Sequence, residues 1–197
     1  MAKGPRYRRS NRRREEGKTN YHRRLRLLKS KKLRVVIRAS NNHIIVQIIQ
    51  SKFGGDKVLI SAHSTELTSK FGWKANTGNV PAAYLTGFLA GLRAKKQNIH
   101  EAILDLGVFY HRIRVLAAFK GILKSELEVP YKESFFPDDL DERITGAQIE
   151  KFANLLKSEN PEKYDQIFSG YLKKNKINPL KISQIVSNTF KTIENNA

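Results

Sequence analysis

Arginine is concentrated at the beginning of the chain, where its number and spacing suit the binding of phosphate. Nine arginines lie between Arg6 and Arg26 and outnumber the lysines there. A guanidinium can hold a phosphate through two parallel hydrogen bonds and can also stack on a nucleobase, whereas lysine acts as a point charge. Tyr7 and Tyr21 add rings on which bases can stack. The pattern predicts contact with RNA or DNA; a solvated tail and a short localisation signal are the alternatives.

A second stretch combines lysine with aromatic residues, in the order Lys70-Phe71-Gly72-Trp73-Lys74. An RNA-contacting loop uses charge for phosphate and a ring for a splayed base or a ribose, and glycine lets the backbone come close. Phe71 and Trp73 also fit the role of core anchors, because large aromatic side chains are usually at least partly buried. The sequence leaves both interpretations open for the rings and predicts phosphate contacts for the two lysines.

The residues that enzymes use are scarce or badly placed. Cysteine is absent, the five histidines lack metal-ligand spacing, and no phosphate-loop, dinucleotide-binding or nucleophile-elbow motif occurs. A nuclease of the ribonuclease H type would need several carboxylates at adjoining strand ends to hold two metal ions, and the middle of the chain offers one central candidate, Asp105. We interpret Asp105 as the partner of a neighbouring arginine or of a backbone group. The chain is predicted to be no enzyme and to need no cofactor.

The excess of positive charge belongs to the N-terminal part of the chain. The 197 residues carry a formal net charge of +19. Residues 1–40 hold 16 Lys and Arg against 2 Asp and Glu, residues 41–130 hold 11 against 6, and residues 131–197 hold 10 of each. Like charges in one block repel each other and become compact on a polyanion. A hydrophobic content of 40% and the lack of long apolar runs indicate a folded, soluble, intracellular body without a membrane segment.

The first half of the chain predicts an arm followed by strands. Residues 3–20 lack apolar periodicity and are expected to be extended, and 21–30 has the leucine spacing of a short helix with a basic face. The β-branched runs 33–39 and 43–50 flank a Ser-Asn-Asn turn, and 58–62 follows a Gly-Gly-Asp turn that includes Asp56. These runs predict a three-stranded antiparallel meander.

Alternating helix and strand signals follow the meander. Residues 81–97 and 112–124 have the apolar spacing of buried helices, and 102–106 is a short apolar run typical of a strand. Gly87 and Gly91 lie four residues apart on one helical face, where we expect close packing against a sheet rather than a ligand site. The order predicts an α/β fold: a mixed sheet with helices packed on it.

The neutral C-terminal part is predicted to be helical. Residues 125–142 contain two prolines and an acidic run and form a connection. Thr145 and Gln148 resemble a capping box that opens a helix, Asn160-Pro161 begins another, and 181–194 forms a third. The chain therefore divides into three parts: residues 1–32 as basic arm and short helix, 33–130 as α/β core, and 131–197 as connection and helical appendage.

Several uncommon strings carry a resemblance to a known family. They are RRREEGKTNYHRRLRLLKSKKLRVVIRASNNHIIVQII, LISAHSTEL, FGWKANTGNVPAAYLTGFLAGLRA and AILDLG, and they follow one another in the family's order. The chain resembles the archaeal and eukaryotic type of the large-subunit ribosomal protein L-eighteen family, which is called L-five in eukaryotes. The resemblance covers about residues 5–150, so it says less about the helices that follow.

This resemblance implies a structural constituent of the large ribosomal subunit in the cytoplasm. It implies binding to 5S rRNA, help in attaching that RNA at the central protuberance, contact with large-subunit rRNA and neighbouring ribosomal proteins, and a mixed α/β fold. The string Gly17-Lys18-Thr19 looks like the end of a phosphate loop but in this family belongs to the RNA-contacting arm. A general RNA-binding architectural protein and a ribonuclease H-like nuclease are the alternative functions.

Charge, loop context and the family motifs together assign a set of residues to RNA contact. No metal, small-molecule substrate or membrane is expected among the partners. The expected RNA-contacting residues are Arg6, Tyr7, Arg8, Arg9, Arg12, Arg13, Arg14, Lys18, Thr19, Tyr21, Arg23, Arg24, Arg26, Lys29, Lys31, Lys32, Arg34, Arg38, Asn42, His43, Lys70, Trp73 and Lys74.

Overall fold

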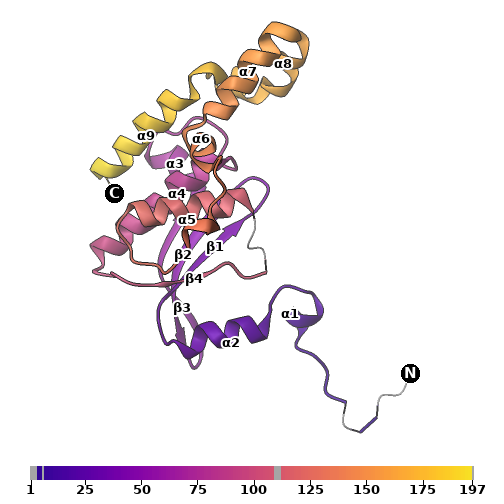
Figure 1. The fold of residues 1–197 in the computed structure, drawn as a ribbon, viewed down its shortest axis with the longest axis vertical. Helices are drawn as coiled ribbons and strands as arrows, with labels where there is room; N and C mark the ends of the chain where they lie inside the picture. Colours follow the sequence, from indigo (N-terminus) through magenta and orange to yellow (C-terminus); the bar gives the residue numbers. More distant parts are fainter. Residues whose placement is uncertain (1–3, 6, 109–111, 197) are drawn as a thin grey trace.

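The fold, seen in a computed structural model that describes residues 4–5, 7–108 and 112–196, places a sheet between two outlying parts (Figure 1). The N-terminal arm, with the short α1 (Arg12–Glu15) and the longer α2 (Tyr21–Lys29), extends from one end of the molecule. The C-terminal helices lie at the opposite end. The predicted helix at 21–30 is therefore confirmed as α2. Within the described residues, every helix is too short or too polar to span a bilayer.

The sheet has four strands in the order β3-β2-β1-β4. The strands are β1 (Arg34–Ala39), β2 (Ile44–Lys52), β3 (Gly55–His63) and β4 (Ile103–Asp105). β1 pairs antiparallel with β2 and parallel with β4, and β2 pairs antiparallel with β3, so the predicted meander and mixed sheet are confirmed.

The second hairpin is tighter than the sequence suggested. Lys52 pairs with Gly55 across a two-residue turn, and Gly55 has a φ of +136° that favours glycine. Asp56, which was expected in the turn, is a residue of β3 and pairs with Ser51. Its side chain therefore has a fixed place at the edge of the sheet.

One face of the sheet is covered by two helices, α4 (Val80–Lys96) and α5 (Ile113–Lys124). Val35, Ile37, Val46 and Ile48 alternate along β1 and β2 and form a hydrophobic core with both helices. Burial of alternate apolar residues is what fixes the register of a sheet, because a slip of one residue would turn the whole set to the other side. We call the opposite face, which carries Arg34, Val36 and Arg38, the open face.

Glycines let α4 and α5 touch backbone to backbone. A Cβ added at Gly87 would lie 1.9 Å from the backbone oxygen of Ala118, and one at Gly121 would lie 2.1 Å from that of Tyr84. At Gly91 the added Cβ would lie 1.7 Å from Ser125 Oγ. The predicted close packing of Gly87 and Gly91 is confirmed, but its partner is α5 and not the sheet.

A short helix, α3 (Ser64–Lys70), follows β3 and is held in place by hydrogen bonds of Glu66. The His63 side chain and Glu66 form a capping box at its start. Arg93 of α4 donates two hydrogen bonds to the Glu66 carboxylate, at 2.6 and 3.1 Å. The hydrogen bonds from Arg93 outweigh the opposing effect of burial and lower the pKa of Glu66 from 4.5 to about 2.

The C-terminal helices share the main core. Leu140, Ile182 and Ile193 belong to the same hydrophobic cluster as the sheet, and Phe190 stacks on Phe88 of α4 with 4.4 Å between ring centroids. The elements of this part are α6 (Leu140–Thr145), α7 (Ala147–Glu159), α8 (Pro161–Ile167), α9 (Ile182–Asn196), the 3-10 turns Glu133–Phe135 and Pro179–Lys181, and a π-helical turn at Gly170–Lys174.

The beginning of α7 differs from the prediction. Thr145 is the last residue of α6 and does not cap α7, which begins at Ala147 after Gly146. Gly146 has a φ of +83°, a left-handed conformation that glycine adopts without strain, and it ends α6 while turning the chain into α7. The helices beginning at Asn160-Pro161 and near 181 are confirmed.

The glycine contact makes a testable prediction for Gly87→Ala. In an ordinary helix, replacing glycine with alanine stabilises the helix by about 1 kcal/mol. Here the methyl group would overlap Ala118, so we expect the free energy of unfolding to fall by about 3 kcal/mol, measured by urea denaturation. Gly54→Ala, where nothing lies within 4 Å of an added Cβ, is the matched control. Equal stability of both variants would contradict the close contact.

The lowered pKa of Glu66 makes a second prediction. Its ionised form stabilises the fold above about pH 4.5, and this contribution is lost as the pH falls toward 2. Glu66→Gln should therefore lower the free energy of unfolding by about 1–2 kcal/mol at pH 7. The gap to the unmodified protein should narrow below pH 4.5. The exposed Glu159→Gln serves as control, and a gap that is constant with pH would refute the assignment.

Candidate nucleic-acid interface

The described part of the arm presents its arginines to solvent. Arg12 is 82% exposed and lies 3.5 Å from Glu16, and Arg9 lies 3.6 Å from Glu15. Exposed ion pairs of this kind contribute little to stability, so these arginines remain available to bind an anion. Arg8 and Arg14 are exposed too, and their side chains have no hydrogen bond or ion pair within the described residues, whereas the predicted contact Arg6 lies outside those residues.

The segment between α1 and α2 forms a tight turn. Arg13 donates a hydrogen bond from Nε to Thr19 Oγ1 at 2.9 Å, and Lys18 lies 2.8 Å from Glu16. Gly17 has a φ of +62°. The Gly-Lys-Thr string is thus a structured turn of the arm that leads into α2.

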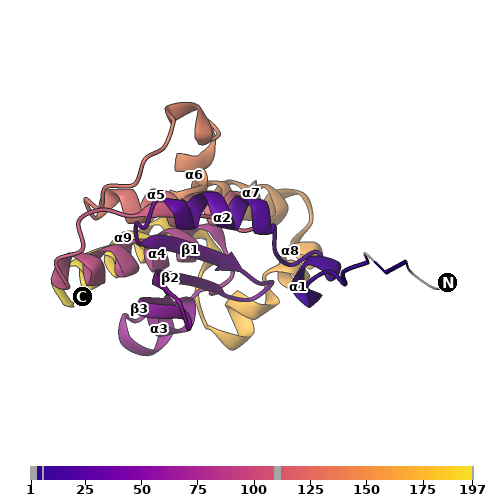
Figure 2. The same ribbon diagram turned by 90° about the horizontal axis from the view of Figure 1, so that it is seen from below.

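Helix α2 rests on the body through polar contacts, and none of its residues is buried. Arg24 donates two hydrogen bonds to Asp56 on β3, at 2.9 and 3.0 Å, and Arg23 donates one to the carbonyl oxygen of Gly107, just beyond β4, at 3.3 Å. Because β3 and β4 are the two edge strands, these contacts tie α2 to both edges of the sheet, and Figure 2 shows α2 alongside β1. Arg26 and Lys29 remain exposed.

Arg34 is the buried cation beneath α2, and only 2% of it is exposed. Its guanidinium donates hydrogen bonds to Asp105 at 2.5 Å and to Asp56 at 2.7 Å. Burial alone would raise the pKa of Asp56, but the hydrogen bonds and charges of Arg24 and Arg34 together lower it. The prediction of Arg34 as an RNA contact is therefore wrong, because Asp56 and Asp105 neutralise its charge inside the protein. The interpretation of Asp105 as the partner of an arginine is confirmed.

The remaining basic residues near the sheet are exposed. Lys32 lies 2.6 Å from Glu101, and Lys31 adopts a φ of +56°. The side chain of Arg38 stands on the open face without a hydrogen bond or ion pair in the described structure. Arg38 thus offers an unneutralised charge next to α2 and the arm.

The tip of the first hairpin is bound to the loop after α3. Asn42 accepts a hydrogen bond through its carbonyl oxygen from the Thr77 hydroxyl at 2.9 Å, and His43 Nδ1 lies 3.1 Å from the same hydroxyl. Arg114 of α5 donates to the carbonyl oxygens of Ser40 and Gly78 at 2.7 and 3.0 Å. Arg114 is not among the residues predicted from the sequence. An arginine in the first turn of a helix opposes the helix dipole, and that anomaly was the available signal.

The loop of residues 70–74 is only partly an interface. Trp73 is fully buried, and its Nε1 donates to the carbonyl oxygen of Asn76 at 3.2 Å. Phe71 is buried as well. The prediction that the Trp73 ring contacts RNA is corrected, because the ring is an anchor of the core. Lys74 is exposed, and Lys70 is exposed but lies 3.2 Å from Glu66.

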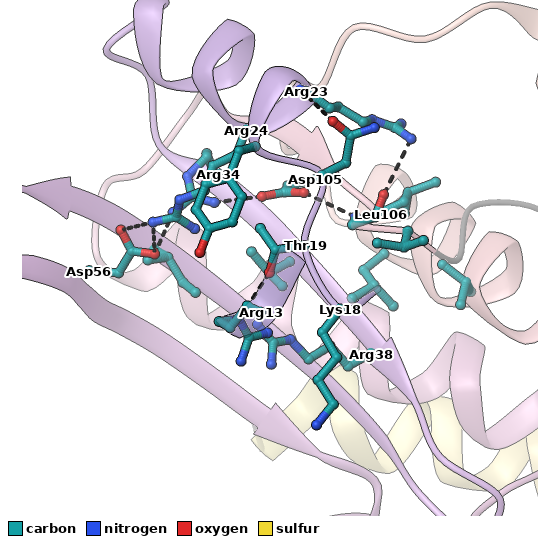
Figure 3. A pocket seen from close by; sticks show the side chains of 18 of the residues that line it. Arg13, Lys18, Thr19, Arg23, Arg24, Arg34, Arg38, Asp56, Asp105 and Leu106 are labelled. Carbon is teal, nitrogen blue, oxygen red and sulfur yellow. Dashed lines mark hydrogen bonds and ion pairs between the residues drawn. The ribbon is translucent and has the colours of Figure 1, made fainter. Parts of the chain in front are cut away.

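A pocket of about 640 Å³ separates the arm turn and α2 from the open face. Figure 3 shows Arg13, Lys18 and Arg38 at one end of it and the network of Arg34 with Asp56 and Asp105 at another. Arg112, which is not among the predicted residues, lines it too. No group of three metal-ligating side chains occurs in the parts of the chain that the structure describes. The arrangement is suited to holding anions.

The buried network predicts a large effect of Asp105→Asn. The change leaves Arg34 inside the protein with one carboxylate fewer, and removing one partner of a buried pair costs about 3 kcal/mol. We expect this loss in the free energy of unfolding, measured by urea denaturation at pH 7. Asp138→Asn, at an exposed residue without a hydrogen bond or ion pair in the described structure, makes the same change of charge and should be neutral. A neutral Asp105→Asn would contradict the structural role of the pair.

Comparisons with known proteins agree with the resemblance seen in the sequence. A family model described as "Ribosomal large subunit proteins 60S L5, and 50S L18" matches residues 5–103. The large ribosomal subunit protein uL18 of Aeropyrum pernix is 46% identical over 198 residues, covering 98% of this chain and 90% of that protein. The uL18 of Sulfurisphaera tokodaii is 43% identical over 176 residues, covering 88% of each. The chain therefore belongs to the family of large-subunit ribosomal proteins 60S L5 and 50S L18, as a structural constituent of the cytoplasmic ribosome and not an enzyme.

Proposed function

We propose that this protein binds 5S rRNA and helps attach it to the large subunit at the central protuberance. Large-subunit rRNA and neighbouring ribosomal proteins are its further partners. The observation that carries the proposal is the set of exposed, poorly neutralised cations on the arm, α2 and the open face. Arg8, Arg14, Arg26, Lys29 and Arg38 lack an acidic partner within the described residues.

Position supports this assignment as much as charge does. α2 continues the arm across the open face, so the exposed side of α2 and the arm form one cationic surface. Guanidinium groups along such a surface can follow the phosphates of a folded RNA, and Tyr7, which is exposed, offers a ring for an unstacked base. Among the predicted contacts, those on the arm and α2 keep this role, together with Lys31, Lys32, Arg38, Asn42, His43, Lys70 and Lys74.

The C-terminal helices are proposed to face protein rather than RNA. Residues 131–197 carry no net charge. Phe152 and Leu155 of α7 and Ile167 of α8 are about half exposed. Apolar groups on a neutral surface favour contact with protein.

The arm predicts a specific change in the salt dependence of binding. Each phosphate that a cation neutralises contributes about 0.7 to 0.9 to the slope of log affinity against log salt. Replacing Arg8, Arg9, Arg12 and Arg14 together with glutamine should therefore reduce the slope for 5S rRNA by about 3. The slope is measured by filter binding at several salt concentrations, with transfer RNA as competitor.

A variant with the same change in net charge is the control. Lys151, Lys157, Lys163 and Lys191 are exposed in the C-terminal helices, and their replacement by glutamine should leave the slope unchanged. Deletion of residues 1–32 without loss of 5S rRNA affinity would refute the role of the arm. Equal competition by transfer RNA would favour the alternative of a general RNA-binding architectural protein.

A further inference from the structure

The pocket between the arm turn, α2 and the open face has the size of a small-molecule site. Its volume is about 640 Å³, inside the range of roughly 300–1,000 Å³ that ligand pockets occupy. It is bounded by Thr19 and Tyr21 on the N-terminal side, by β1 on the floor, and by the loop at Gly107 and Val108. Three separate parts of the chain therefore meet around one cavity.

The charges that line the pocket favour an anion. Its acidic side chains are Asp56 and Asp105, and both are already bound by Arg34 or Arg24. The side chain of Arg38 has no hydrogen bond or ion pair within the described residues. The cationic side chains in addition to Arg34 are Arg13, Lys18, Arg23, Arg24, Arg38 and Arg112.

The pocket also offers an apolar surface and an unused donor. Val36, Ile49 and Val115 lie among its lining residues, and they can contact the face of a ring. Arg34, which lines the pocket and is almost fully buried, has one nitrogen, Nε, that is buried without a hydrogen-bond partner in the described structure. Buried donors are normally paired, so an acceptor on a ligand would complete this group.

We propose that this pocket holds a single unpaired nucleotide of the bound RNA. The phosphate lies against Arg13, Lys18 and Arg38, and the base lies over the apolar floor next to Tyr21. A base that is stacked inside a helix can enter such a cavity only by leaving the stack, so the pocket selects an RNA with an extruded nucleotide at this place. This inference rests on the proposed function, because it concerns how the same surface recognises RNA rather than whether it does.

Val108 allows the pocket to be blocked without a change in charge. It lines the cavity, is 38% exposed and carries no charge. In the series Val108→Ala, Val108→Leu and Val108→Trp, the affinity for 5S rRNA should fall as the side chain grows. Val108→Trp should weaken binding about tenfold, the order of magnitude of one lost base contact. The salt slope should fall by no more than about 1, because the excluded nucleotide takes one phosphate contact with it while the contacts along the arm remain.

The controls separate the pocket from other effects. Leu155→Trp, at a half-exposed residue of α7, places the same tryptophan side chain in the C-terminal helices and should leave the affinity unchanged. Thermal unfolding of Val108→Trp should match that of the unmodified protein. Failure of the unmodified protein to prefer 5S rRNA over transfer RNA would refute the proposed function. A normal preference with unchanged affinity across the Val108 series would refute the pocket alone.

Free nucleotide distinguishes the two sources of such a ligand. Adenosine 5′-monophosphate, titrated calorimetrically into the unmodified protein, should show no saturable binding, because a lone nucleotide lacks the contacts along the arm. Saturable binding that Val108→Trp abolishes, with an unchanged affinity for 5S rRNA across the Val108 series, would overturn the proposal and make the cavity a small-molecule site. An equal loss of RNA affinity in Leu155→Trp would also overturn it.

Discussion

The buried guanidinium of Arg34 is the interaction on which the rest of the structure depends. It sits on the central strand β1 and reaches a carboxylate on each edge strand, Asp56 on β3 and Asp105 on β4. Asp56 also accepts hydrogen bonds from Arg24 of α2. One network therefore joins β1, β3 and β4 to the helix that carries the arm. A buried charge tolerates little displacement of its partners, because an unpaired ion is costly there. The position of α2 follows from that constraint.

The division of charge along the chain explains why α2 needs such a network. In the C-terminal part, acids and bases are equal in number and pair locally, as Arg143 with Asp139 and Lys151 with Glu142. The arm has few acids of its own, and α2 buries none of its residues. Its attachment therefore relies on Asp56 of the sheet and on the carbonyl oxygen of Gly107. The outer cations of α2, Arg26 and Lys29, stay unneutralised, which is what a polyanion requires.

The elements of the fold could be predicted from the sequence because their signals are local. Alternating β-branched residues gave β1 to β3, and Asn79, with Pro81 at the second helical position, marked the beginning of α4. The predictions that were wrong concern residues whose environment depends on parts of the chain that are far away in sequence. Arg34 looks like any other basic residue of its region, and its partners lie 22 and 71 residues away. Trp73 between two lysines has the same pattern whether it faces solvent or the core, and only the packing of α3 and α4 decides.

The attachment of α2 through polar contacts, without a fully buried side chain, has a consequence for the speed of assembly. A cationic segment that stands out from the body meets a polyanion at longer range than the body itself, which enlarges the capture radius. The RNA can first bind the arm. The sheet, which is then tethered to that RNA, finds its own contacts over a short distance instead of by free diffusion. A hydrophobic anchor under α2 would hold the segment more firmly but would shorten this reach. The polar attachment thus favours rapid binding of the RNA over a rigid position of α2.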